Sequence, residues 1–518
     1  MELKLLWKGM RTAVVRLAGA GKYHADKPYE LKISDGRCLT TETVVTSIYG
    51  LKPGQPCSIS ALVDGQEAGT VSFVTEKESV TLNVRDFGAF GDGKHDDTAA
   101  IQCAVMASRK HSRVLVPKGV FCVSSIFLKS HLHLYLAEGA VIKGIPDRDR
   151  CPILPGTIPE TDGKGEKNFG TWEGNPLDMF AGVITGLHVS DVTISGQGTI
   201  DGGAGKNNWW KDVRTRNVAW RPRLVFLHDC RQVVLQGITL RNSPSWTLHP
   251  YFSQDLYFLD LNIHNPADSP NTDGLDPESC SRVSVIGTQI SVGDDCIAIK
   301  SGKIYQALKY QTPTSDMRVE NCFMRDGHGA VTVGSEIAAG VRGIRVKNCE
   351  FFHTDRGLRI KTRRGRGELS VLTDIRFENI RMDHVKTPFV VNSFYFCDPD
   401  GHSEYVGSKK ALPVDERTPS VGKLVFRDIQ ADGCEYAAAW IAGLPERKIE
   451  ELDFERVSVS FAPDAGTGQP AMMEGCGPLS RAGFVISGVK NLTMRAVTVN
   501  GCEGEPRILS DVDSLTES

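Results

Sequence analysis

The chain has 518 residues, of which 40% are hydrophobic, and its formal net charge is −3. This length predicts two domains or one long array of repeats, and the composition is that of an ordinary soluble protein. The near-neutral charge gives no general attraction to nucleic acid or to a membrane surface, and no stretch reaches the roughly 18 apolar residues of a membrane span. We therefore predict no nucleic-acid partner and no membrane partner.

Residues 1–78 have the pattern of a small antiparallel β-sandwich. Runs of alternating hydrophobicity, such as TAVVRLAG, ETVVTSIYG and GTVSFVT, are separated by turn residues at 52–54 and 64–65. The segment GLKPGQPCSISALVDGQEAGTVSFVT resembles the C-terminal half of a fibronectin type III domain. A short polar linker at 76–79 predicts a domain boundary here.

The first residues, MELKLLWKGMRTAVVRLAG, bear on where the protein resides. Lys4, Lys8 and Arg11 interrupt the apolar positions, so the segment lacks the continuous hydrophobic region of a signal peptide. We expect a cytoplasmic protein on this ground, or an extracellular one if a leader has been removed.

A helix is predicted near the start of the second domain. In NVRDFGAFGDGKHDDTAAIQCAVMAS, residues 83–108, the acids Asp96 and Asp97 precede a helical pattern that runs through Met106. The segment resembles the cap of pectin-degrading right-handed β-helices, whose open end would otherwise present unpaired strand edges. The two acids could form a second acid site, but capping and turn formation is the favoured interpretation.

One short pattern recurs through the rest of the chain. Apolar and polar residues alternate, a turn residue often follows, and successive copies lie about 23 to 49 residues apart. A single coil cannot bury its own apolar face, so the copies must stack. We predict a right-handed parallel β-helix over residues 81–518, since a propeller would have more regular spacing. The runs are DVTISG (from 191), QVVLQG (232), DLYFLD (255), RVSVIG (282), DMRVEN (316), GIRVKN (343), DIRFEN (374), KLVFRD (423), ELDFER (451) and NLTMRA (491).

Three long insertions, at roughly 146–186, 201–222 and 394–421, interrupt the repeats. Insertions of this length in a compact array are usually functional or disordered. They carry aromatic residues that suit either sugar stacking or a small local core, and the two interpretations stay open: Trp172, Trp209, Trp210 and Tyr405.

The 14 cysteines are scattered through strand-like runs, which favours buried free thiols over disulfides. Cys322 and Cys349 fall at equivalent points of neighbouring repeats, so we expect them to stack. No Cys-x-x-Cys or His/Cys spacing indicates zinc.

Four tripeptides carry the chemistry. They are NTD at 271–273, GDD at 293–295, GHG at 327–329 and RIK at 359–361. Asp273, Asp294 and Asp295 stand at the ends of short apolar runs, where like charges raise each other's cost of ionisation. Such acids suit acid/base work on one bond, provided that their surroundings push the pKa values apart. Because the coils are parallel, we expect the three carboxylates on one side of the array.

The four tripeptides, in this order, resemble the signature of the polygalacturonases, glycoside hydrolase family 28, over residues 81–518. The resemblance implies that Asp294 is the general acid, that Asp273 and Asp295 hold and deprotonate a water, and that His328 tunes the acid. It implies inverting hydrolysis, for which the carboxylates should lie roughly 6.5–9.5 Å apart.

Cationic residues near the motifs are candidates for binding a uronate substrate. Arg359 and Lys361 alternate along a strand, so both point the same way and can clamp a carboxylate, with Lys300 as a further member. Asn271 is expected to hydrogen-bond the substrate or its neighbours. The run at 363–366 contains three arginines, for which steering of the anion is slightly favoured over a solvated face.

The sequence therefore predicts hydrolysis of the α-1,4 bonds of polygalacturonate, inverting and exo-acting at the non-reducing end, without cofactor or metal. The insertions could wall off one end of the cleft, and a cytoplasmic enzyme would meet imported oligomers. The alternatives are an endo-polygalacturonase, a rhamnogalacturonan or xylogalacturonan hydrolase, and a non-catalytic carbohydrate-binding β-helix. A Ca²⁺-dependent pectate lyase would need its acids gathered as metal ligands. The oligomeric state is not predicted.

Overall fold

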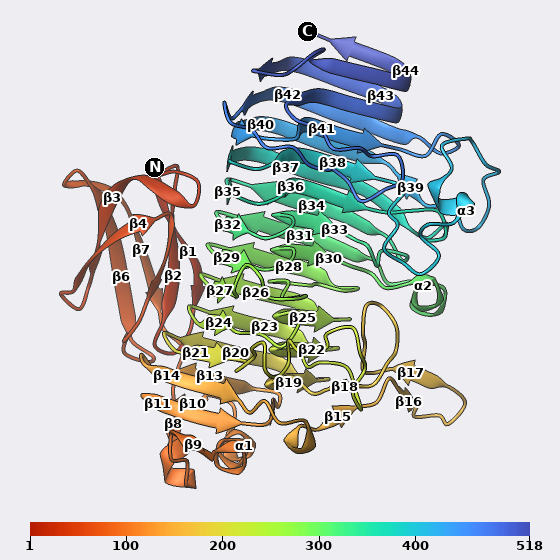
Figure 1. Ribbon diagram of the computed structural model, residues 1–518. Coiled ribbons are helices and arrows are strands. Elements are labelled where there is room, and N and C mark those ends of the chain that lie inside the picture. The colour runs from red at the N-terminus through yellow and green to blue at the C-terminus, as the bar shows by residue number, and fades with distance from the viewer.

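The computed structural model describes all 518 residues and consists of two β-rich units that stand side by side (Figure 1). The smaller unit is a sandwich of two antiparallel sheets, and the larger is a stack of parallel coils. The predicted sandwich followed by a right-handed parallel β-helix is therefore confirmed. None of the helices is long and apolar enough to cross a membrane.

The sandwich uses the strands that the alternating runs predicted. Its core contains Val15, Leu31 and Ile59, all fully buried, which come from both sheets. One sheet has the order β1 (Glu2–Lys8), β2 (Ala13–Ala18) and β5 (Val45–Ile48). The other has the order β4 (Cys38–Thr43), β3 (His24–Ile33), β6 (Pro56–Val63) and β7 (Gln66–Val74).

The β-helix has three faces, each a ladder of parallel strands. The first face contains β8 (Val80–Asn83), β10 (Ser112–Val116), β13 (Leu132–Leu136), β20 (Ser190–Gly196), β23 (Arg231–Gln236), β26 (Gln254–Leu259), β28 (Ser281–Ile286), β31 (Thr314–Glu320), β34 (Val341–Lys347), β37 (Val371–Asp383), β40 (Lys423–Cys434), β42 (Ile449–Phe461), β43 (Ala482–Asn500) and β44 (Arg507–Glu517).

The second face contains β9 (Asp92–Asp96), β11 (Gly119–Val123), β14 (Ala140–Gly144), β21 (Thr199–Asp201), β24 (Thr239–Arg241), β27 (Asn262–His264), β29 (Gln289–Val292), β32 (Phe323–Asp326) and β35 (Glu350–Phe352), and the later halves of β37, β40, β42 and β43 continue it. The third contains β12 (Ile126–Phe127), β19 (Ile184–Leu187), β22 (Val225–His228), β25 (Leu248–Tyr251), β30 (Ile297–Ile299), β33 (Val331–Val333), β36 (Arg356–Lys361), β38 (Thr387–Asn392) and β41 (Ala437–Ala442).

Stacking of the repeat buries one apolar column per inward position. Val285 of β28 pairs with Val319 of β31, which pairs with Val346 of β34, and all three are 0–1% exposed. Each such side chain contributes about 1.5–3 kcal/mol when it leaves water. The period-2 alternation of the sequence therefore fixes the register of every coil.

The corner between the first and second faces is built by the residue that ends each run. Asn321, Asn348 and Asn379 all have φ of 52–54°, a left-handed conformation that asparagine tolerates better than most residues. Two of the side chains form an asparagine ladder, in which Asn379 Nδ2 donates to Asn348 Oδ1 at 2.7 Å, whereas Asn321 Nδ2 donates to Lys22 O of the sandwich. The next corner, between the second and third faces, carries the tripeptides NTD, GDD and GHG, whereas RIK lies within β36 of the third face.

One end of the β-helix is covered by α1 (Thr98–Ala107), whose buried residues include Ile101 and Val105 (Figure 1). Asp96 accepts from the Thr98 backbone N–H, and Asp97 accepts from the backbone N–H groups of Phe90 and Gly91. The acid pair therefore holds the turn before the helix. The short helix η1 (Val84–Phe87) precedes it.

The long insertions form small structures of their own. The first contains η2 (Arg148–Arg150) and two short hairpins, β15 (Ile153–Leu154) with β18 (Met179–Phe180) and β16 (Thr157–Pro159) with β17 (Glu166–Asn168). The third contains α3 (Glu404–Gly407) and precedes β39 (Ser420–Val421). The remaining helix, α2 (Ile304–Tyr310), follows the GDD coil.

All 14 cysteines are free, as the sequence predicted. Cys322 and Cys349 are both buried and occupy the same place in adjacent coils: the thiol of Cys322 donates to Val285 O, and that of Cys349 donates to Val319 O one coil further on.

Candidate active site

The three predicted carboxylates meet at the corner between the second and third faces. Asp294 and Asp295 lie between β29 and β30, and the adjoining coil brings Asp273 beside them, because Gly274 N donates to Asp295 O at 3.0 Å. One oxygen of each carboxylate lies within 4.8 Å of the others. The expected separation of roughly 6.5–9.5 Å is therefore wrong, since two of the acids are neighbours in the chain and the third is one coil away.

Asp295 is fixed from all sides. Its Oδ1 accepts from Thr332 Oγ1 at 2.8 Å and from Arg359 Nη1 at 3.2 Å, and its Oδ2 accepts from Lys361 Nζ at 2.8 Å. Burial alone would raise the pKa of this carboxyl, but the Lys361 ammonium and the Arg359 guanidinium hold its pKa well below the usual range. Asp295 is therefore an ionised carboxylate with a set orientation.

Asp273 has the opposite electrostatics. Burial raises its pKa well above the ordinary value, and the nearby carboxyls of Asp276 and Asp294 add to the effect. Asp273, unlike Asp295, forms no ion pair with a cation. The site thus contains neighbouring carboxyls whose pKa values are driven apart, which is the condition for acid and base roles in one cluster.

Asp294 is the accessible member of the cluster. Its side chain is 23% exposed, against 1% for Asp295, and its Oδ1 lies 3.3 Å from His328 Nδ1. The hydrogen bond to Asp294 raises the pKa of His328. A group that must reach the leaving oxygen of a substrate has to be exposed, and Asp294 with His328 satisfies this requirement.

The GHG turn needs both of its glycines. A Cβ at Gly327, where φ is +80°, would lie 2.5 Å from Asp294 O. A Cβ at Gly329 would lie 2.4 Å from Thr332 Oγ1 and 2.9 Å from Asp295 Oδ1. The turn therefore lets His328 approach the acids without a side chain displacing Asp295.

The predicted substrate-binding residues lie around the acids, but most already have protein partners. Arg359 and Lys361 are 6% and 8% exposed and contact Asp295. Lys300 Nζ lies 3.1 Å from Glu336 Oε2 and sits over the ring of Trp246. A uronate would join Arg359 and Lys361 as a further anion rather than meet free cations.

Asn271 lies at the edge of the site in a left-handed conformation, with φ of 54°. Its Oδ1 accepts from Arg221 Nη2 at 2.6 Å, which connects the NTD turn to the insertion at 201–222. Its position agrees with a role in holding the neighbours of the acids, the second of the two roles expected.

The arginine run at 363–366 is neither a solvated face nor an exposed steering patch. Arg363, Arg364 and Arg366 are 0–5% exposed. Arg363 pairs with Asp398 and Asp400, Arg366 pairs with Asp398, and Arg364 forms a bidentate pair with Glu446. The run therefore anchors the insertion at 394–421 to the β-helix, because that insertion supplies Asp398 and Asp400.

The insertion tryptophans are mostly packed within the protein. Trp172 stacks on Trp220 with ring centroids 4.7 Å apart, and the Arg223 guanidinium lies over the Trp172 ring at 4.6 Å from its centroid. Trp209 is 2% exposed in a local core with Phe180. The local-core interpretation therefore holds for Trp172 and Trp209.

Sequence reasoning missed several residues that complete the site. Thr332 fixes Asp295, and Asp276 lies beneath Asp273, where burial raises its pKa to about 8. Glu336 holds Lys300, and the Lys300 ammonium and other cations keep the pKa of Glu336 low despite burial. The acid-rich spacing of Asp273, Asp276 and Glu278 could have indicated the second layer of acids, but nothing marks Thr332.

The carboxylate cluster is the group whose geometry could hold a cation, since its three oxygens converge. Its donor set fits a metal poorly: both oxygens of Asp295 are occupied by cations and a hydroxyl, and the raised pKa of Asp273 favours a neutral acid. A divalent cation would need ionised and unpaired carboxylates.

The fold and the site together define an enzyme of the parallel β-helix class that acts on carbohydrate by acid/base chemistry. The family model for glycosyl hydrolases family 28 matches residues 153–408, and one described as rhamnogalacturonase A/epimerase, pectate lyase-like, matches residues 81–142. A probable polygalacturonase from Vitis vinifera is 28% identical over 417 residues, which is 79% of each chain. Residues 153–408, which contain the four tripeptides, belong to glycoside hydrolase family 28, and this part of the chain makes the protein a glycoside hydrolase.

Two solved structures have the same fold. The family 28 exopolygalacturonase of Yersinia enterocolitica superposes with a TM-score of 0.73 and 18% identity, over 99% of this chain and 98% of its own. A hyperthermoactive exopolygalacturonase from Thermotoga maritima gives 0.65 and 24%, over 82% and 94%. The first of these likenesses extends over both the sandwich and the β-helix.

Proposed function

We propose that this protein is an exo-polygalacturonase that removes galacturonate units from the non-reducing end of α-1,4-linked oligogalacturonides and inverts the anomeric configuration. The observation that carries the proposal is the cluster of three carboxylates in which Asp295 is held ionised and Asp294 is exposed beside His328. Each carboxyl then has a different part in one hydrolytic step.

In the proposed step, Asp294 gives its proton to the glycosidic oxygen, and His328 supports it through their contact. Asp295 orients the attacking water and takes its proton. Asp273 holds a proton within the cluster, which lowers the repulsion that a third negative charge would add. Arg359 and Lys361, already beside Asp295, attract the uronate carboxylate to the same place.

Exo action is supported by the way two insertions converge on α2. Asn168 of the first insertion donates from its backbone N to Tyr310 Oη at 2.7 Å and from Nδ2 to Tyr305 Oη at 3.2 Å. Asp398 of the third insertion pairs with Lys303, directly before α2, at 3.4 Å. Figure 1 shows β15–β18, α2 and α3 projecting from the same side of the β-helix. Such a wall beside the catalytic coil favours substrates that end there.

Viscometry combined with product analysis on polygalacturonate tests the mode of attack. An exo enzyme releases monomer or dimer while the viscosity falls slowly. A rapid fall in viscosity with a ladder of oligomers would show that the cleft is open at both ends. If no reducing sugar is released, polygalacturonate is not the substrate. Release from a rhamnogalacturonan or a xylogalacturonan alone would make that polysaccharide the substrate instead.

Inversion is supported by the bonding of Asp295 rather than by carboxylate spacing. One oxygen of each of the three carboxylates lies less than 5 Å from the others, and this distance alone would favour a retaining enzyme. Both Asp295 oxygens are already hydrogen-bonded, which suits a fixed base better than a nucleophile that must form a covalent bond. Proton NMR of the first product should show the β-anomer, and an α-anomer would make one of these aspartates a nucleophile.

A further inference from the structure

A groove runs along the seam between the sandwich and the β-helix, at the corner between the first and second faces. Four hollows of about 580, 260, 210 and 250 Å³ adjoin one another there. Lys347 lines the first and third hollows, Asn379 lines the first and second, and Arg381 lines the second and fourth. We call this the seam groove, and its members include Lys22, Phe352, Lys347, Asn379, Arg381 and Arg456.

Three cations of the seam groove have no ion-pair partner. They are Lys22, Lys347 and Arg381, of which Lys347 and Arg381 are exposed. Three of the five carboxylates in the lining pair with arginines: Glu320 with Arg16, Glu378 with Arg427 and Asp428 with Arg456. Glu350 and Asp383 pair with the histidines His24 and His384, which are cationic only when protonated. The three unpaired cations are therefore the groups that can bind the carboxylates of an anionic ligand.

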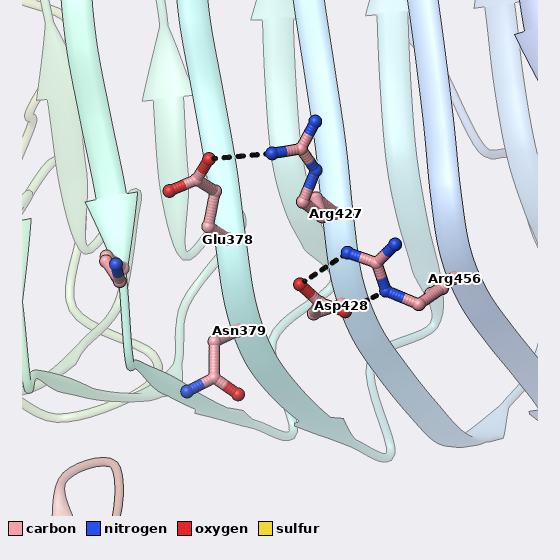
Figure 2. Close-up of a pocket in the computed structure, with 6 residues that line it drawn as sticks. Glu378, Asn379, Arg427, Asp428 and Arg456 are labelled. Atoms are coloured by element: carbon pink, nitrogen blue, oxygen red, sulfur yellow. Dashed lines mark hydrogen bonds and ion pairs between the residues drawn. The ribbon is translucent and has the colours of Figure 1, made fainter. Parts of the chain in front are cut away.

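Polar groups on the groove floor remain available for hydroxyl groups. Figure 2 shows Asn379 beside two ion pairs, Glu378 with Arg427 and Asp428 with Arg456. Asn379 uses its amide nitrogen on Asn348, and its own Oδ1 has no partner. Asn348 and Asn379 stand in adjacent coils, so their amides lie at the strand spacing of about 4.8 Å.

One end of the seam groove has an aromatic platform. Phe352 is partly exposed and lies next to Phe323, with ring centroids 6.5 Å apart and an interplanar angle of 27°. Tyr23 of the sandwich stacks on Phe323 at 5.6 Å, and the Arg325 guanidinium lies 5.5 Å from the Phe352 centroid. His353 stacks on Phe352 with ring centroids 4.0 Å apart, so a sugar ring that carries an acid group packs against the exposed part of this aromatic cluster, beside the free cation Arg381.

The seam groove is separate from the catalytic corner but close to it. The strand β32 begins at Phe323 in the groove, and the turn that follows it carries His328. Five residues of extended chain span about 16 Å, so the two sites lie on successive corners of one coil. A polymer could reach both, whereas a trimer could occupy only one.

We propose that the seam groove is a second, non-catalytic binding site for an acidic oligosaccharide, a chain of uronate units. Lys22, Lys347 and Arg381 bind its carboxylates, the asparagine ladder binds its hydroxyl groups, and Phe352 stacks on one ring. The identity of the sugar as galacturonate rests on the proposed function; the acidic character of the ligand rests on the groove itself.

The test is calorimetric titration with polygalacturonate of the full chain carrying Asp294→Asn, which prevents hydrolysis. Adding Lys347→Ala and Arg381→Ala should weaken binding about tenfold, because two ion pairs with the ligand are lost. The difference between the variants should shrink at high salt. The matched control, Lys94→Ala with Lys110→Ala, removes two unpaired surface cations near α1 and should bind like its parent. Phe352→Ala tests the platform without changing charge.

Two outcomes would overturn the seam site: an affinity in the seam variant that equals that of its parent, or an equal loss of affinity in the seam and control variants. Kinetics with Asp294 intact separate this proposal from the function. The seam variant should show a raised KM for polymer and an unaltered kcat/KM for trigalacturonate. If no variant hydrolyses any galacturonide while seam substitutions still weaken polyuronate binding, the proposed function fails and the seam site stands.

Discussion

At the scale of single residues, the site depends on three carboxyls of one type being placed in different surroundings. Asp295 has two cations and a hydroxyl, Asp273 has burial and other acids, and Asp294 has solvent and His328. Chemically identical side chains thereby acquire separate tasks. A substitution that changes the surroundings should therefore move the pH dependence, whereas one that removes the exposed acid should stop turnover.

Asp294→Asn should lower kcat on oligogalacturonides by roughly 10²–10⁴-fold, the usual loss when a general acid is removed. The change is nearly isosteric and the side chain is partly exposed, so the melting temperature should stay close to that of the parent. Asp316→Asn, at an exposed position of β31 on the first face, is the matched control. Turnover within a few-fold of the parent would remove Asp294 from the mechanism.

Lys361→Met should shift the acid limb of the pH–activity profile to higher pH. The Lys361 ammonium helps to hold the pKa of Asp295 low, so its loss raises that pKa and Asp295 is protonated sooner as the pH falls. The measurement is kcat/KM against pH on trigalacturonate. If Lys361 instead acts chiefly as a uronate clamp, KM rises at every pH, and the variant no longer distinguishes a free from a methyl-esterified substrate.

The sequence predicted which residues form the site, but it did not predict the contacts that set their protonation. The tripeptides placed Asp273, Asp294, Asp295 and His328 in one cluster because parallel stacking brings equivalent corners together. The sequence does not contain the contacts that decide protonation. Lys361 meets Asp295 across 66 positions of the chain, so its partner could not be inferred from spacing.

At the scale of elements, the period-2 runs predicted the coils because each inward position must be buried in every copy. The arginine run shows where this reasoning ends. A cluster of charged residues has the same local sequence whether it faces water or an ion-pair partner. Arg364 can be buried because it pairs with Glu446, which lies 82 residues further along the chain. Charge patterns that depend on distant insertions are therefore invisible to local reasoning.

Arg364→Met should destabilise the protein by about 3–5 kcal/mol, since it leaves a buried carboxylate without its partner. The guanidinium also binds the carbonyls of Tyr405 and Ser408, so the insertion at 394–421 should become sensitive to protease. Urea unfolding and limited proteolysis measure the two effects. Arg376→Met, which breaks an exposed pair with Asp374, should cost no more than about 1 kcal/mol. Equal losses in both variants would contradict the anchoring role.

At the scale of the whole molecule, the sandwich is part of one structure with the β-helix rather than a loosely attached domain. Its core cluster continues into Val234, Leu259 and Ile286 of the β-helix. Arg16 pairs with Glu320, and the Ser47 backbone N–H donates to Asp260 Oδ2 at 2.9 Å. The sequence predicted both units but not this interface. An apolar residue at an outward position of a strand does not show which other part of the protein covers it.

The interface should make stability depend on pH through Asp260. Burial against the sandwich raises the pKa of this carboxyl to about 7, whereas an unfolded aspartate titrates near 3.9. The folded state therefore holds the proton more tightly. The stability that this proton binding adds to the folded state is fully present below about pH 4 and is lost as the pH rises through about 7. At about 1.4 kcal/mol per pKa unit, the free energy of unfolding falls by at most about 4 kcal/mol. The true decrease is smaller, because the Asp260 side chain is partly exposed to solvent.

Asp260→Asn should flatten this dependence, because an amide can still accept the Ser47 hydrogen bond and does not ionise. The free energy of unfolding, measured in urea between pH 4 and 8, should fall with pH in the parent and much less in the variant. Asp255→Asn is the control: Arg282 lowers the pKa of Asp255, so that carboxylate loses its stabilising effect only as the pH falls below about 4, and its substitution should leave the slope between pH 4 and 8 close to that of the parent. A parent-like slope in Asp260→Asn would show that the interface carboxyl is ionised when folded.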